Sequence, residues 1–184
     1  MKKLIVGNWK MHGSRAFNAE LIQGLLAADL ATTAPKATVA VCPPMVFLAD
    51  VADALQGSVI AVGTQDIAVQ AQGAYTGEVA GPMIWEFGAK YAIVGHSERR
   101  SYHAESDQLV ADKAKAALSH GLVPIVCVGE TLAEREADQT EAVVGRQLQV
   151  VIDALGGDIA RVVVAYEPVW AIGTGKTASP AQAQ

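Results

Sequence analysis

The chain has 184 residues, of which 51% are hydrophobic and 18% are charged. This composition supplies enough apolar side chains for a buried core and excludes an intrinsically disordered protein. The formal net charge of −5 lacks the basic surplus of nucleic-acid-binding proteins, so no nucleic acid partner is expected. The length fits one domain over residues 1–184, with no second domain.

No stretch of the sequence fits a targeting or membrane segment. The first apolar run, Leu4–Val6, is far shorter than the roughly 7–15 apolar residues of a secretory signal. No window approaches the roughly 20 apolar residues of a membrane span. Two cysteines, Cys42 and Cys127, cannot form a disulfide framework and are expected to be free, buried packing thiols. The sequence therefore predicts a cytoplasmic protein with no membrane partner.

Six short apolar runs alternate along the chain with longer segments of helical period. They are rich in Val and Ile and apolar on both alternating faces, which is typical of parallel strands buried on both sides. The predicted strands are Leu4–Val6, Thr38–Cys42, Val59–Val62, Tyr91–Val94, Val123–Val128 and Val162–Tyr166.

The segments between the runs carry helix signals. Ser14 is a candidate N-cap, Gly121 is a candidate terminator, and Ser179-Pro180 fits the start of a further helix. Charged residues within these helices (Glu134–Glu136, Asp107 and Asp112) are predicted to be solvated. The predicted helices are Ala16–Leu30, Pro44–Leu55, Ser106–His120 and Glu134–Leu155.

A strand followed by a helix, repeated six times, predicts an α/β fold with a parallel sheet. Right-handed crossovers in series give either a doubly wound open sheet or a (β/α) barrel, and the periodicity does not decide between them. In both folds ligands bind at the carboxyl ends of the strands. The residues directly after each run are therefore the candidates for function.

Three residues with complementary chemistry follow three different runs: Lys10, His96 and Glu167. A carboxylate can remove a proton from a carbon beside a carbonyl, and an imidazole can polarise that carbonyl and shuttle protons between its oxygens. An ammonium can hold an anionic substrate and the developing enediolate charge. Together these groups predict the 1,2-isomerisation of a hydroxycarbonyl compound.

Longer blocks around these residues resemble the signature sequences of the triosephosphate isomerases. The blocks are Asn8–Met11, Gly73–Glu78, Gly95–Arg100 and Tyr166–Gly175, and they occur in the family's order. The resemblance implies a TIM-barrel-like fold and a phosphorylated triose substrate. It implies the interconversion of dihydroxyacetone phosphate and D-glyceraldehyde 3-phosphate through an enediolate, in glycolysis and gluconeogenesis, without a cofactor. The resemblance implies this mechanism as well, with a carboxylate base and a neutral imidazole as the electrophile.

The resemblance also implies a role for individual residues. Glu167 would be the base, His96 a neutral electrophile at the start of a short helix, and Lys10 the electrostatic element. Asn8 would lie beside Lys10 at the substrate, and Glu98 would orient Lys10.

Two further segments take roles from the resemblance. Residues Pro168–Lys176 would form a mobile lid over the substrate, with Gly173 offering a backbone N–H to the phosphate. The segment Gly73–Glu78, which includes Thr76, would contact the neighbouring subunit of a homodimer or higher homo-oligomer.

Other site chemistries fit the sequence poorly. A phosphate loop at Gly173–Thr177 would need glycine where Trp170 stands. A dinucleotide fingerprint beginning at Gly173 lacks the strand directly before it and the acidic residue about 20 positions later. No pair or cluster of histidine and cysteine has metal-ligand spacing, so no metal is predicted. The histidines expected to be structural or solvent-facing are His12, His103 and His120.

The number of strand signals is six, whereas a complete (β/α)8 barrel takes about 250 residues and eight strands. We therefore expect an incomplete barrel with impaired turnover, because the family draws rate from binding the remote phosphate. The first and sixth strands would present apolar edges, covered by oligomerisation through these edges and through Gly73–Glu78. Two alternatives to oligomerisation are a smaller closed barrel and a fragment that is completed by a complementary piece. The alternative function is a catalytically inactive, self-associating scaffold.

Overall fold

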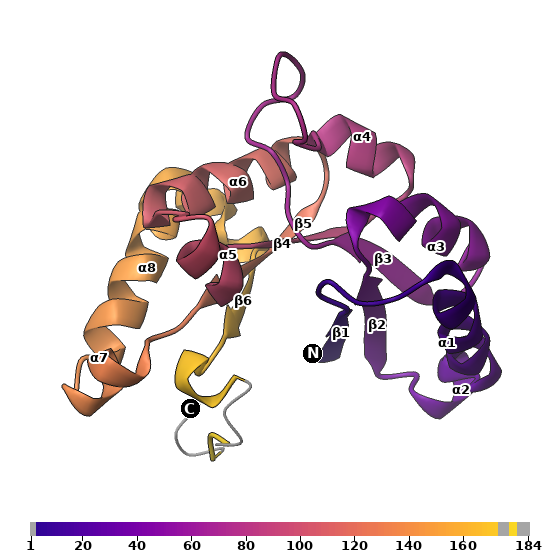
Figure 1. Cartoon of the computed structure of the whole chain (residues 1–184), viewed down its shortest axis with the longest axis horizontal. Helices are drawn as coiled ribbons and strands as arrows, with labels where there is room; N and C mark the ends of the chain where they lie inside the picture. Colours follow the sequence, from indigo (N-terminus) through magenta and orange to yellow (C-terminus); the bar gives the residue numbers. More distant parts are fainter. Residues whose placement is uncertain (1–2, 173–176, 180–184) are drawn as a thin grey trace.

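The structure is a computed structural model that describes residues 3–172 and 177–179 (Figure 1). Six parallel strands form one sheet in the order β1-β2-β3-β4-β5-β6, so every strand pairs with its neighbours in sequence. The sheet curls into a half-barrel, which confirms the predicted incomplete TIM-barrel-like fold. The strands are β1 (Lys3–Asn8), β2 (Ala37–Cys42), β3 (Ile60–Thr64), β4 (Tyr91–Val94), β5 (Val123–Val128) and β6 (Val163–Tyr166).

Helices surround the curled sheet, with α1 and α3 beside the first three strands and α6 and α8 beside the last three (Figure 1). The α-helices are α1 (Arg15–Ala27), α2 (Leu30–Thr33), α3 (Leu48–Ala54), α4 (Gly81–Glu86), α5 (Ser97–Tyr102), α6 (Asp107–Ser119), α7 (Leu132–Glu136) and α8 (Thr140–Leu155). The 3-10 turns are η1 (Met45–Phe47), η2 (Gly156–Arg161) and η3 (Val169–Ala171).

Side-chain caps set the starts of the two 13-residue helices. The Ser14 hydroxyl accepts the Phe17 backbone N–H at α1, and Ser106 accepts the Leu109 N–H at α6. Each cap satisfies an amide that has no partner within its helix. The predicted Ser14 cap and the predicted helix over Ser106–His120 are therefore confirmed.

Three predicted helices are divided in the structure, so their predicted extents were wrong. The segment predicted as Ala16–Leu30 contains α1, which ends at Ala27, and the first residue of α2, with Asp29 at φ 43 between them. The segment predicted as Pro44–Leu55 is the turn η1 followed by α3. The segment predicted as Glu134–Leu155 is two helices, because Asp138 has φ 57 and breaks the right-handed path between α7 and α8. A capping box at Thr131 starts α7, its hydroxyl accepting the Glu134 N–H while the Glu134 carboxylate accepts the Thr131 N–H.

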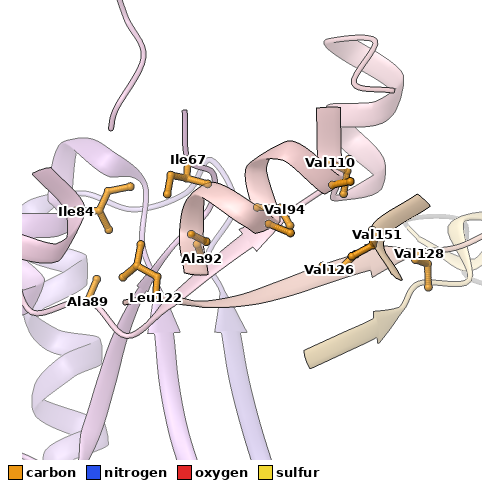
Figure 2. Packing of buried hydrophobic residues seen from close by; sticks show 13 residues of the cluster. Ile67, Ile84, Ala89, Ala92, Val94, Val110, Leu122, Val126, Val128 and Val151 are labelled. Atoms are coloured by element: carbon orange, nitrogen blue, oxygen red, sulfur yellow. The ribbon is translucent and has the colours of Figure 1, made fainter. Parts of the chain in front are cut away.

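The face of the sheet that the helices cover holds two apolar clusters. The larger one joins β4 and β5 to α4, α6 and α8, and Val110, Val126 and Val151 lie within it (Figure 2). The smaller one joins β2 and β3 to α1 and α3 around Val41 and Val51. Fully burying a side chain of this size contributes about 1.5–3 kcal/mol. These clusters therefore hold the helices against the sheet and fix the strand ends.

The opposite face of the sheet has a small cluster of strand residues only: Cys42, Ile93, Ile125 and Cys127. Both thiols are free and buried, as predicted. Burial raises the pKa of Cys42 to about 12, and burial together with the Glu167 charge raises the pKa of Cys127. The two cysteines are thus protonated packing groups at neutral pH.

The pairing between β3 and β4 is the shortest in the sheet, and we call it the β3–β4 seam. Only Gly63 and Thr64 of β3 find register partners there, opposite Tyr91 and Ala92. The two helix-covered clusters separate at this point, and partly buried Met45 packs against both. On its helix-covered face the half-barrel thus has two packed halves, joined by a short ladder and by Met45, while the cluster around Cys42 and Ile93 spans the seam on the opposite face.

The two edges of the sheet are apolar and exposed, as predicted. Ile5 of β1 is 55% exposed and Val164 of β6 is 46% exposed, although β4 and β5 are almost wholly buried between them. Within the described residues neither β1 nor β6 has a second neighbouring strand. Each edge therefore offers unpaired backbone groups beside an apolar side chain.

Candidate active site

Lys10 lies two residues beyond β1 in a backbone conformation that side chains rarely adopt. Its φ is 50, which costs a non-glycine residue about 1–3 kcal/mol and persists only where neighbours enforce it. The Asn8 Oδ1 accepts the Lys10 N–H at 3.0 Å, and the Gln65 Nε2 donates to the Lys10 carbonyl at 2.9 Å. The same Gln65 Nε2 donates to the Cys42 carbonyl at the end of β2. The strand ends thus hold the lysine in its strained turn.

The Lys10 side chain points to the short helix after β4. Its Nζ lies 2.8 Å from the Glu98 Oε1, and both side chains are partly exposed. The predicted contact between Glu98 and Lys10 is therefore present. An ion pair this open to water contributes little to stability, so its consequence is mainly the direction of the ammonium.

His96 follows β4 directly and caps α5. Its Nδ1 accepts the backbone N–H of Glu98 at 3.2 Å, so the ring proton lies on Nε2. That Nε2 lies 2.9 Å from the Glu167 Oε1, which accepts its hydrogen. The ring is almost fully buried. These contacts define one tautomer of a neutral imidazole, with its N–H directed at a carboxylate.

Glu167 follows β6, and its backbone N–H donates to the Val128 carbonyl of β5. Its second carboxylate oxygen, Oε2, accepts the Ser97 backbone N–H at 2.9 Å. Burial raises the pKa of the Glu167 carboxyl, but the hydrogen bonds from His96 and Ser97 together outweigh burial and lower that pKa below its ordinary value. The carboxyl is therefore ionised at neutral pH.

A cavity of about 520 Å³ opens beside these groups at the carboxyl ends of the strands. Asn8, Lys10, His96 and Glu98 are among its lining residues, so the residues from β1 and β4 share one space. A similar cavity of about 540 Å³ lies near the opposite ends of the strands, around Ile60 and Lys90. In barrel folds chemistry belongs to the carboxyl ends, so the first cavity is the candidate site.

The predicted site residues divide into three groups. Five of them lie together at the carboxyl end of the sheet, joined by hydrogen bonds and ion pairs: Asn8, Lys10, His96, Glu98 and Glu167. Thr76 lies on an exposed loop away from them. Gly173, and with it part of the predicted lid over Pro168–Lys176, lies outside the described residues.

Glu130, which strand-exit reasoning passed over, is a completely buried carboxylate two residues beyond β5. Its oxygens accept hydrogen bonds at 3.0 Å from the Tyr166 hydroxyl and the Trp170 Nε1, and at 3.1 Å from the Arg135 Nη1. The Arg135 guanidinium also lies 4.5 Å from the centre of the Trp170 ring. Tyr166 and Trp170 flank Glu167 in sequence, so Glu130 holds both sides of that residue. The prediction that Arg135 is solvated was therefore wrong.

Gly129 makes the close approach of β5 to Glu167 possible. A side-chain carbon on Gly129 would collide with the Glu167 backbone carbonyl oxygen. Gln147 of α8 holds this glycine by accepting its N–H at 2.8 Å and donating to its carbonyl at 3.1 Å. The sequence feature that could have identified Gly129 and Glu130 as site residues is their position directly after the predicted strand Val123–Val128.

Two negative findings apply to the described part of the chain. No group of three or more His, Cys, Asp or Glu side chains there could hold a metal ion. In the same residues, no helix combines the length and the apolar character that crossing a membrane requires.

A parallel strand–helix sheet with a lysine, a histidine and a glutamate at three strand ends defines an enzyme of the (β/α)-barrel class. Residues 3–184 match the sequence model of the family described as triosephosphate isomerase. The chain belongs to this family, whose members are enzymes.

Curated relatives extend the match along the whole sequence. The chain is 60% identical over 184 residues to the triosephosphate isomerase of Cupriavidus necator, covering 100% of this chain and 73% of the relative. It is 60% identical over 183 residues to that of Bordetella pertussis, covering 99% of this chain and 72% of the relative. It is 57% identical over 183 residues to that of Ralstonia nicotianae, covering 99% of this chain and 72% of the relative.

Proposed function

We propose that the chain interconverts dihydroxyacetone phosphate and D-glyceraldehyde 3-phosphate, with Glu167 as the base, His96 as the electrophile and Lys10 as the electrostatic element. Family membership supports the reaction. The observation that carries the residue roles is the 2.9 Å contact between the His96 Nε2 and the Glu167 Oε1, with Lys10 beside them through Glu98.

The chemistry follows from the state of each group. The ionised Glu167 removes a proton from the carbon that bears the hydroxyl, and the His96 N–H hydrogen-bonds the carbonyl oxygen as an enediolate forms. The Lys10 ammonium stabilises the developing negative charge. Return of the proton to the neighbouring carbon, with a proton exchanged between the two oxygens through His96, completes the isomerisation. No atom is gained or lost.

The substrate must separate the two groups that now touch. At 2.9 Å, the gap between His96 and Glu167 has no room for a reacting carbon and oxygen. Substrate binding therefore replaces this hydrogen bond by two new ones, from His96 to the substrate oxygen and from the substrate to the Glu167 carboxylate. The Ser97 N–H contact, on the other carboxylate oxygen, holds the carboxylate in its present orientation.

The substitution Lys10→Met is expected to lower isomerase turnover by about 10²- to 10³-fold, because it removes a preorganised positive charge from the site. A coupled isomerase assay measures the rate in both directions. Lys36→Met is the matched control, since Lys36 is exposed and remote from the cavity. Equal activity in the two variants would remove Lys10 from the mechanism. An absence of wild-type turnover at high protein concentration would favour the inactive self-associating scaffold instead.

We also propose that the protein forms a homodimer through the segment Gly73–Glu78. Residues 70–78 are exposed without interruption, and the loop stands out from the body of the molecule (Figure 1). Its base is fixed by the hydrogen bond from the Ala68 N–H to the Val79 carbonyl, and its tip is shaped by the bond from the Tyr75 N–H to the Gly73 carbonyl. Such a preformed protrusion supports insertion into a second copy.

The acceptor for this loop would be the partner's surface beside the cavity. Met11 and Tyr102 line the cavity rim with 93% and 80% exposure, so large apolar side chains meet solvent there. Burying them against a second copy would remove this exposed apolar surface from water. The exposed sheet edges at Ile5 and Val164 offer a second region for self-association.

Wild-type protein is expected to sediment as a dimer at micromolar concentration, and Thr76→Arg is expected to weaken association at least about tenfold, because an added charge would be desolvated at the contact. Thr32→Arg, on the exposed surface of α2, is the control. Sedimentation equilibrium measures both. A stable wild-type monomer at this concentration would contradict the proposal.

The remaining expectations stand as parts of the same proposal. We place the protein in the cytoplasm, and the free buried thiols Cys42 and Cys127 support a reducing compartment. We treat residues 1–184 as one domain, which the single continuous sheet of the described residues supports.

A further inference from the structure

Arg100 of α5 joins three parts of the fold with one guanidinium. Its Nε donates to the Gly95 carbonyl at 2.8 Å, directly after β4, and its Nη2 donates to the Cys127 carbonyl of β5 at 3.2 Å. Its Nη1 donates to the Asp107 Oδ1 at 2.6 Å, at the start of α6. The side chain is only 15% exposed, so these are contacts of a largely buried charge. The prediction that Asp107 is solvated was wrong for this reason.

The sequence around Arg100 leaves room for this arrangement. Gly95 has φ +69, in the left-handed region that favours glycine. A side-chain carbon on Gly95 would lie 2.6 Å from the Val110 Cγ1 and 3.1 Å from the Arg100 Nη2. The missing side chain therefore lets the guanidinium lie across the ends of β4 and β5.

The helix that carries Arg100 also carries the backbone groups that orient the proposed catalytic pair. The Ser97 N–H binds the Glu167 carboxylate, and the Glu98 N–H binds the His96 Nδ1. Yet α5 has six residues, too few for a helix to be stable by itself in water. Whatever fixes α5 against the sheet therefore also fixes these two N–H groups.

The two arginines of α5 differ in what they bind. Arg99 reaches the carboxylates of Asp66 and Glu105, which belong to loop segments. Arg100 reaches backbone carbonyls at the ends of two strands, and its carboxylate partner Asp107 is also bound by Arg146 of α8 at 3.1 Å. Arg100 thus supplies a direct side-chain link from α5 to the backbone of two strand ends.

We propose that Arg100 is a positioning residue for the reaction: by fixing α5 across the ends of β4 and β5, it holds the Ser97 and Glu98 N–H groups against Glu167 and His96. This inference rests on the proposed function of those two residues. The planar, forked guanidinium of Arg100 is required for this role, because it binds two carbonyls and one carboxylate in fixed directions.

The test replaces Arg100 in two ways. Arg100→Met keeps much of the length and removes the charge, whereas Arg100→Lys keeps the charge and removes the fork. Arg146→Met is the control, because it also removes a cation from Asp107 but touches neither strand carbonyl. The readouts are the Glu167 carboxyl titration by ¹³C NMR, assigned with Glu167→Gln, the ¹⁵N NMR tautomer signature of His96, and kcat and KM. Thermal unfolding checks that each variant is folded.

Loss of the Ser97 N–H contact should move the Glu167 titration upward in both Arg100 variants, because one of the groups that lower its pKa is withdrawn. The groups facing this carboxylate are the His96 ring, the Ser97 amide and the Cys127 thiol, and all remain in the variants. The His96 ring should lose its single tautomer as the Glu98 N–H moves away. We expect kcat to fall about tenfold with KM changed less than about threefold.

The outcomes distinguish three effects of replacing Arg100: a displaced α5, the loss of a positive charge, and a general loss of stability. An upward shift in Arg100→Met alone, with Arg100→Lys titrating as wild type, would show a through-space charge effect and overturn the proposal. Unchanged NMR signatures in either folded variant, even with a lower melting temperature, would also overturn it. Both NMR readouts work without turnover, so a wild-type chain that fails the isomerase assay still tests Arg100.

Discussion

Glu167→Gln is expected to lower kcat by about 10²- to 10⁴-fold with little change in KM, because glutamine keeps the shape of the side chain but cannot take up a proton. The same coupled assay measures it. The exposed Glu136 offers the matched control Glu136→Gln. Residual activity within about tenfold of wild type would mean that another group removes the proton.

The pH dependence of this residue follows from its contacts. Its pKa lies below the ordinary value of 4.5, so the folded-state carboxyl stays ionised as pH falls to that value. A carboxyl with a lowered pKa contributes stability above its unfolded pKa, and this contribution is lost as pH falls through the folded pKa. Between about pH 5 and 8, kcat/KM should therefore not be limited by protonation of Glu167 in the free protein. A ¹³C titration midpoint above 4.5 would contradict this.

Glu130→Leu is expected to lower the free energy of unfolding by about 3–5 kcal/mol, because the partly buried Tyr166 hydroxyl and the buried Trp170 indole both lose this acceptor and Arg135 loses its carboxylate. Urea unfolding measures the change. The tryptophan emission should also shift, since Trp170 loses a charged neighbour. Glu20→Leu, on the exposed face of α1, is the control for adding a leucine.

The stability difference between the wild type and Glu130→Leu should depend on pH. Burial raises the pKa of Glu130, but its hydrogen bonds, including those from Trp170, Arg135 and Tyr166, outweigh burial and lower it below 4.5. The carboxylate thus stabilises the fold above pH 4.5, and this contribution fades as pH falls through the folded pKa. The stability difference between wild type and Glu130→Leu should shrink in that acidic window. A difference that is small at pH 7 would show that the network contributes little.

The sheet and the centre of the site were predictable because both depend on local pattern. Apolar runs located all six strands, although β1 and β3 each continue two residues beyond their predicted ends, to Asn8 and Thr64. Strands in parallel order deliver their next residues to one end of the sheet, so Lys10, His96 and Glu167 had to come near one another. Their contacts with Asn8 and Glu98 follow from the same placement.

What escaped prediction depends on contacts between different elements of the fold. Asp107 and Arg135 sit on helices with the charge pattern of solvated surfaces, yet each binds a group from another element. Gln65 has no motif that marks it as a support for Lys10. The break at Asp138 depends on a left-handed residue that is not glycine. Periodicity indicates which face of its helix a residue occupies, and it carries no information on which group of another element packs against that face.

The β3–β4 seam divides the residues of the proposed site between two parts of the fold. On the helix-covered face each half of the sheet, here called a unit, has its own packed cluster and the ladder between the units is short. On the opposite face Cys42 of β2 packs with Ile93 of β4 and so joins the two units. Lys10 belongs to the first unit, whereas His96 and Glu167 belong to the second. The bond from Lys10 to Glu98 crosses this boundary. The alignment of the lysine with the histidine and the glutamate therefore depends on the few contacts that join the two units across the seam.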